Sequence, residues 1–292
     1  MAGSVLYDAP GPRTIARHRL YTLLSVVALA VFLLLVVWKL DSEGQLEYDL
    51  WEPFVTPDYL EALFVDGLLN TLLMAFGAIP GAVIFGVVFG VGKLSDHWFL
   101  RWPSWLVVEF WRAVPVLLSM IFWYYLLSIG DGPLSALQCV IIALTLYNGA
   151  VLAEVFRAGI LAVPKGQVEA AYAIGMRKTQ VMTTIQLPQA VKIMLPALVS
   201  QCVVALKDTS LGYAITAPGL TYIGEQIYTE FRVNQVPTAI VLAALYIGVN
   251  LILTAIAHWL QRKYVGERNP IDLTRVGNQQ GGAAGGGMAA VP

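Results

Sequence analysis

Charged residues are scarce in this chain: they make up only 13% of its 292 residues, whereas 58% are hydrophobic and the mean hydropathy is +0.68. Soluble proteins carry about 25% charged residues, so an ordinary water-soluble core is excluded. The net charge of -1 also lacks the basic excess of a nucleic-acid binder, and no nucleic-acid partner is expected. The composition is that of a chain that lies mostly in lipid.

Cysteine and histidine are also few, with two and three residues. Cys139 and Cys202 lie in apolar runs, where a thiol behaves as a small hydrophobic side chain, so no disulfide framework is predicted. His18, His97 and His258 are scattered along the chain. A His/Cys metal cluster is therefore not expected.

Long apolar runs are what the chain does have. A helix needs about 20 apolar residues to cross a hydrocarbon core of roughly 30 Å. Six stretches meet this requirement, which predicts an all-α integral membrane protein with six transmembrane helices. They run approximately over Leu20–Leu40, Leu68–Gly92, Ala113–Gly130, Leu134–Phe156, Ile193–Ala217 and Thr238–Leu260.

Basic residues near the span ends predict the orientation. Residues 1–19 hold Arg13, Arg17 and Arg19, which indicates a cytoplasmic N-terminus, and no cleavage pattern follows the extra first span at 20–40. Residues 41–66 contain eight acidic residues and no Lys or Arg, as expected of an external loop. The Gly- and Ala-rich residues 263–292 are predicted to be a cytoplasmic, largely disordered tail of a multi-pass plasma-membrane protein.

The second predicted span carries the pairs Gly77 with Gly81 and Gly86 with Gly90. Small residues four apart allow helix backbones to approach closely, and packing within the chain is the simplest interpretation. Pro80 lies between the glycine pairs and is expected to bend this helix.

Residues 157–192, between the fourth and fifth spans, are neither lipid-compatible nor of low complexity. The pattern predicts a short helix over Gln167–Ile174, a left-handed residue at Gly175, and a second helix from Lys178 to about Gln186 that Pro188 ends. Such a compact protrusion, here called the knob, is suited to contact with another protein.

The knob sequence resembles the EAA loop of the membrane subunits of binding-protein-dependent ABC importers. The resemblance rests on residues at fixed spacing: Glu169, Ala170, Ala171, Gly175, Ile185, Leu187 and Pro188. The opening segment Val5–Arg13 and the extra first span resemble the actinobacterial glutamate permeases of that family. Other segments resemble its polar amino-acid branch, so the similarity covers about residues 65–262. These segments are Gly67–Thr71, Glu109–Pro115, Ala153–Arg157, Val163–Gln167 and Lys207–Leu211.

The resemblance implies a type I importer permease fold, with a five-helix core at 67–262 and a coupling loop at 157–192. It implies a second permease subunit, homologous or identical, a cytoplasmic ATPase that contacts the knob, an external solute-binding protein, and surrounding membrane lipid. The solute would be a polar amino acid, with glutamate favoured.

No cofactor is expected on this chain, and ATP and magnesium are assigned to the partner ATPase. A phosphate-binding loop is conceivable only at Gly92-Lys93, where Val87 occupies the position of the required glycine and Leu94 that of the required Ser or Thr. The chain is therefore not expected to be an enzyme.

Lys207, Asp208, Thr209 and Ser210 fall near the middle of the fifth predicted span. Charge inside a membrane is costly, so these residues are candidates for the solute path. Structural pairing at a helix contact would explain them equally well. Asn70 and Thr71, near the outer end of the second span, are weaker candidates because such side chains often bond between helices.

The motif Glu-x-x-Arg-Ala occurs twice, with Glu109 and Arg112 at one helix end and Glu154 and Arg157 at another. Residues three apart share a helix face, so each Glu can reach its own Arg. A cytoplasmic gate is one interpretation, and simple positive-inside anchoring is the other.

The sequence also bears on two other function classes. An intramembrane hydrolase requires a nucleophile beside a base, yet no Gly-x-Ser-x-Gly motif is present and His258 is the only histidine in a predicted span, so no catalytic residue is assigned. A secondary, ion-coupled amino-acid transporter is the alternative to the ABC permease, although the six spans show no paired inverted halves.

Overall fold

A computed structural model describes residues 12–265, and every regular element in that range is a helix. The all-α prediction is therefore confirmed. Five helices or continuous helical runs are long and apolar enough to span a membrane, and one strongly bent pair brings the total to six if it counts as a span. The predicted disordered tail lies outside the described residues, apart from its first three positions.

The chain divides into two units. Among the described residues, the first unit contains 12–70 together with 218–245, and the second contains 71–217 together with 246–265.

The first unit begins with α1 (Pro12–Ser42), whose most apolar stretch has no buried residue within the protein. The predicted external segment is mainly short helices: α2 (Tyr48–Trp51), a 3-10 turn (Glu52–Val55), α3 (Pro57–Glu61) and a π-helical stretch (Ala62–Leu69). It packs against α11 (Leu220–Phe231), a helix that the sequence did not predict. Gly67 permits this contact, since a Cβ there would lie 3.2 Å from the Leu220 Cα.

The second unit is built around α7 (Ala136–Leu161), the most deeply buried of the spanning helices. The side chain of Ser135 caps its start by accepting a hydrogen bond from the Gln138 N–H, and the Gln138 side chain accepts one from the Ser135 N–H in return. Around α7 pack α5 (Trp98–Ala113), α6 (Val116–Leu127) and α10 (Leu187–Asp208).

The glycine pairs of α4 (Asn70–Lys93) lie directly against α7. A Cβ on Gly81 would lie 2.8 Å from Thr145 Cγ2, and one on Gly90 would lie 2.8 Å from the Ala153 carbonyl oxygen. These separations are shorter than van der Waals contact, so only glycine fits. The interpretation of packing within the chain is confirmed.

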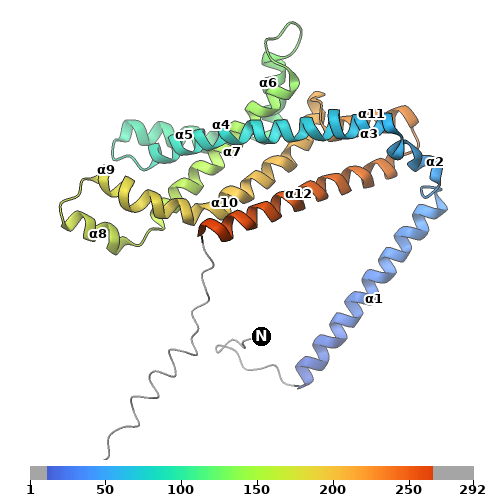
Figure 1. The fold of residues 1–292 in the computed structure, drawn as a ribbon, viewed down its shortest axis with the longest axis horizontal. Coiled ribbons are helices and arrows are strands. Elements are labelled where there is room, and N and C mark those ends of the chain that lie inside the picture. Colours follow the sequence, from blue (N-terminus) through green and yellow to red (C-terminus); the bar gives the residue numbers. More distant parts are fainter. Residues whose placement is uncertain (1–11, 266–292) are drawn as a thin grey trace, which may run out of the picture. The chain divides into compact units, whose positions relative to one another are not determined.

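The third predicted span, Ala113–Gly130, is too long, because only Val116–Leu127 is helical in the structure, as α6. The structure has α5 and α6 meeting at an angle of 99° around Val114 and Pro115 (Figure 1). Val114 is extended, with ψ of 122°, because a residue before proline avoids the helical region. Residues 98–112, which lie between the second and third predicted spans, form most of α5.

The predicted helix end at Pro188 is also wrong. Helix α9 (Lys178–Val181) continues through a π-helical turn (Met182–Gln186) into α10, and a 3-10 segment (Thr209–Ile215) follows. In the π turn the Leu187 N–H bonds to the Met182 carbonyl, five residues back. This shift of the bonding pattern accommodates a proline, which has no N–H to donate.

The final helix, α12 (Gln235–Val265), extends the predicted span Thr238–Leu260 at both ends.

Candidate functional site

The knob consists of α8 (Lys165–Ala173), the turn at Gly175, and the start of the long α9–α10 helix. Gly175 has a φ of +85°, which confirms the predicted left-handed residue. Its N–H bonds to the Tyr172 carbonyl and the Met176 N–H to the Ala171 carbonyl, the two bonds of a Schellman motif. The turn that ends α8 is thus fixed by local backbone geometry.

The EAA-loop residues surround a shallow groove between α8 and the base of α10. Four of them line it, Ala170, Ala171, Ile185 and Pro188, in a hollow of about 500 Å³. Ala171 is buried, whereas Glu169 and Ala170 are exposed. Leu187, with 40% of its surface exposed, and Gly175 do not line the groove.

Two polar contacts hold the knob in place. The Gln189 side chain donates to Gln167 Oε1 at 2.7 Å and ties α10 to α8. Lys178 forms an ion pair with Asp96, in the connection between α4 and α5. The Lys178 ammonium, which hydrogen-bonds that carboxylate, holds the pKa of Asp96 below its ordinary value.

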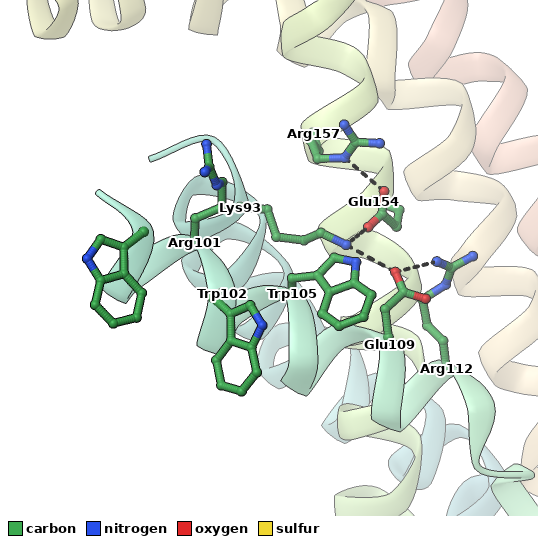
Figure 2. Close-up of a pocket in the computed structure, with 9 residues that line it drawn as sticks. Lys93, Arg101, Trp102, Trp105, Glu109, Arg112, Glu154 and Arg157 are labelled. Carbon is green, nitrogen blue, oxygen red and sulfur yellow. Dashed lines mark hydrogen bonds and ion pairs between the residues drawn. The ribbon is translucent and has the colours of Figure 1, made fainter. Parts of the chain in front are cut away.

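The two Glu-x-x-Arg-Ala motifs meet at Lys93, the last residue of α4 (Figure 2). The Lys93 ammonium contacts Glu109 Oε1 at 3.2 Å and forms a second ion pair with Glu154. Only 7% of the Lys93 side chain is exposed. No local sequence pattern links Lys93 to the two motifs, so the sequence did not reveal its central position.

Each glutamate also pairs with its own arginine, as predicted. Arg157 Nε lies 3.0 Å from Glu154 Oε2, and Arg112 Nη1 lies 3.5 Å from Glu109 Oε1. The five side chains form one connected network that joins α4, α5 and α7. We call it the Lys93 network. The two motifs are therefore linked through a lysine rather than by direct cross-pairing.

The solute-path candidates do not form one cluster. Lys207 and Asp208 are the last two residues of α10, rather than the middle of an uninterrupted span, because the α-helix changes there to a 3-10 segment. Lys207 is exposed and Asp208 half-buried, and neither forms an ion pair with any residue in the range 12–265.

The hydroxyl candidates differ in exposure. The buried Thr209 hydroxyl donates to the Leu206 carbonyl at 2.6 Å, which is a local structural role, and Ser210 is half-buried. Asn70 donates to the Asp66 carbonyl in the first unit, whereas Thr71 belongs to the second unit and is buried.

A polar contact that the sequence did not reveal joins α7 to α10. The Gln201 side chain donates to Asn148 Oδ1 at 2.6 Å, and Asn148 in turn donates to the Leu144 carbonyl. Both side chains line a cavity of about 60 Å³ among α4, α7 and α10. Amide side chains carry no periodic signal, so their pairing depends on the folded packing.

A multi-pass bundle of apolar helices with a protruding EAA-type knob defines a membrane-embedded transport subunit. Residues 78–266 match the family described as "Binding-protein-dependent transport system inner membrane component", and the chain belongs to that family.

Named relatives agree with this assignment. The chain is 40% identical to the "Glutamate transport system permease protein GluD" of Corynebacterium glutamicum, over 77% of this chain and 83% of that protein. It is 30% identical to the "Histidine/lysine/arginine/ornithine transport system permease protein HisM" of Salmonella typhimurium, over 67% of this chain and 89% of that protein.

The fold is similar to that of solved importer subunits. A chain of an amino acid ABC transporter crystallised with histidines matches with a TM-score of 0.64 and 30% identity, over 69% of this chain and 94% of that chain. A chain of the MetNI methionine ABC transporter has a TM-score of 0.60 and 20% identity, which supports the fold alone. The type I importer permease fold is thus confirmed, and family membership gives the secondary-transporter alternative no support.

Proposed function

We propose that this chain is the permease subunit of an ABC importer that takes up a polar amino acid, with glutamate as the favoured solute. The observation that carries the proposal is the similarity to a glutamate permease over most of both chains, together with a complete EAA loop on an exposed knob. A second permease subunit, a cytoplasmic ATPase and an external solute-binding protein complete the transporter. ATP and magnesium belong to the ATPase.

The knob is the proposed contact with the ATPase. Its groove offers an apolar floor, and Glu169 on the exposed side of α8 provides a carboxylate for a hydrogen-bond donor on the partner. Helix α8 has nine residues and is too short to be stable alone in water, so its position depends on its contacts. A partner that grips the knob therefore also positions α8.

A continuous helix would transmit a movement of the knob to the membrane part of α10. Lys178 to Asp208 is helical without a break, which at 1.5 Å per residue corresponds to about 45 Å. The Gln167–Gln189 bond links α8 to this helix. Displacement of α8 by the ATPase would consequently shift the membrane part of α10, up to the candidate residues Lys207 and Asp208.

The coupling proposal is tested with Glu169→Lys and Gly175→Val in the intact transporter. Both variants should insert and fold, yet lose uptake, and their ATPase activity should no longer respond to the loaded binding protein. Thr179→Lys, on an exposed position of the same knob outside the groove, is the matched control and should keep uptake. Normal uptake and normal ATPase retention in the first two variants would overturn the assignment.

We further propose that the Lys93 network is a cytoplasmic gate. It fastens the inner ends of three helices to each other, so opening this end requires breaking at least one ion pair. Glu154→Gln should raise ATP hydrolysis in the absence of the binding protein, because the closed state loses its contact with Lys93. Unchanged basal hydrolysis, with normal insertion, would leave positive-inside anchoring as the role of these residues.

Lys207 and Asp208 are proposed to line the solute path. Lys207→Met or Asp208→Asn should abolish or alter uptake while the complex still assembles and hydrolyses ATP. Loss of assembly in both variants would instead support a structural role for the two residues.

The proposed orientation places both termini in the cytoplasm and residues 41–66 outside. A cysteine at Glu47 should react with an impermeant thiol reagent in intact cells, and one at Thr179 should not. Both positions are exposed, so accessibility differs only by the side of the membrane. Labelling in the reverse pattern would contradict the orientation.

A further inference from the structure

Helix α5 carries a face of tryptophan and charged side chains that neither the coupling knob nor the solute path uses. Trp98, Arg101, Trp102 and Trp105 follow at spacings of three, one and three residues, so they lie along one side of the helix. Glu109 follows Trp105 by four residues and Arg112 follows Glu109 by three, so both lie on the same side of the helix and bring this face to the Lys93 network. The opposite side of α5 is buried, with Val108 packed against Ala150 and Ala153 of α7.

This face borders a cavity of about 860 Å³, lined by α5 together with Lys93, Glu154 and Arg157. Figure 2 shows Trp102 and Trp105 on the same helix as Arg101, beside the Lys93 side chain. The lining holds four cationic side chains, Lys93, Arg101, Arg112 and Arg157, against two glutamates, which leaves a surplus of two positive charges. The cavity therefore favours an anion.

The arginines retain donors for such an anion. A guanidinium has five N–H groups. Arg112 and Arg157 each use one atom in the ion pairs described above, and Arg101 forms no ion pair within residues 12–265. Lys93, by contrast, is buried between two carboxylates. Arg101 is thus the cation with the most unused hydrogen-bonding capacity.

The tryptophans indicate which anion fits. Trp98 is 72% exposed, Trp102 58% and Trp105 48%. Indole rings prefer the headgroup level of a membrane. Basic pockets between membrane helices bind anionic lipid headgroups. A free amino-acid carboxylate would satisfy the arginines but would leave the indole surfaces without an apolar partner. We propose that this cavity binds the phosphate headgroup of an anionic phospholipid, with its acyl chains along the tryptophan face of α5.

Native mass spectrometry of the intact transporter tests the proposal, with phosphatidylglycerol and phosphatidylcholine added in equal amounts. The wild-type protein should retain phosphatidylglycerol preferentially, and Arg101→Gln should reduce that preference about fivefold, the change expected for one basic residue near an anionic lipid. Because Arg101 is exposed and forms no ion pair with another described residue, the variant should fold normally. Arg262→Gln, at the end of α12, removes the same charge outside the cavity and should keep the preference.

Further measurements distinguish a lipid site from general electrostatics, a free-anion site and a contact between subunits. Brominated phosphatidylglycerol should quench wild-type tryptophan fluorescence more than it quenches Trp102→Phe. Equal loss of preference in Arg101→Gln and Arg262→Gln would mean general electrostatics and would overturn the site. Displacement of the lipid by soluble glycerol phosphate or glutamate would overturn it in favour of a free-anion site. Efficient disulfide formation between two copies of Trp102→Cys would show that the second subunit covers the face, again against the proposal.

Discussion

The Lys93 network should be a measurable source of stability, and Lys93→Met is the change that tests it. The substitution removes the ammonium of a side chain that is only 7% exposed and that contacts two carboxylates; the Glu154 side chain is 22% exposed and that of Glu109 40%. Breaking a fully buried pair costs about 3 to 5 kcal/mol. Glu109 is too exposed to contribute fully, and Glu154 keeps Arg157 as a partner, so the expected loss in free energy of unfolding is about 1 to 3 kcal/mol.

A double-mutant cycle isolates the contact itself. The single variants Lys93→Met and Glu154→Gln and their combination are compared by denaturation in mixed micelles, and a coupling energy of about 1 kcal/mol or more is expected. The Lys39–Glu43 pair on α1, where both side chains are more than half exposed, is the matched control and should show coupling too small to resolve. Additive effects at Lys93 and Glu154 would refute the buried network.

Two further predictions concern backbone packing and pH. Gly90→Ala places a methyl group 2.8 Å from the Ala153 carbonyl oxygen and should destabilise the protein by about 1 to 3 kcal/mol in thermal unfolding, whereas Gly248→Ala, with nothing within 4 Å, should not. Lys178 lowers the pKa of Asp96 in the folded protein. The ion pair is therefore intact above the ordinary carboxyl pKa of about 3.9, and it is lost as the pH falls through the lower pKa that Asp96 has in the folded state. Hydrogen exchange of the knob should therefore increase in acid, and Asp96→Asn should remove that pH dependence; an unchanged acid response in the variant would contradict the assignment.

Sequence patterns predicted those features of the fold that depend on residues close together in the chain. Apolar run length located the spanning helices, and Gly175 was predicted to be left-handed because a helix end requires such a residue there. The prolines show where such rules fail. Val114 before Pro115 is extended and the helix breaks, yet Leu187 before Pro188 stays helical, with ψ of -45°. A π turn precedes Pro188, and the residue pair before each proline does not by itself predict the difference.

The Lys93 network depends on contacts distant in sequence. The i, i+3 spacing revealed each Glu–Arg pair, but Lys93 and Glu154 are 61 residues apart. They meet because Gly90, one turn before Lys93, allows α4 to approach Ala153, the residue before Glu154. The glycine stripe was visible in the sequence. The sequence did not show which residues of α7 these glycines face. That alignment of α4 against α7 places Lys93 between the two glutamates.

The most direct test of the account is solute uptake by the purified transporter in liposomes, with its ATPase and binding protein present and ion gradients abolished by ionophores. We predict that labelled glutamate accumulates only when ATP is supplied on the ATPase side, and that Glu169→Lys eliminates this accumulation. Uptake driven by an imposed ion gradient without ATP, and unaffected by Glu169→Lys, would contradict the account.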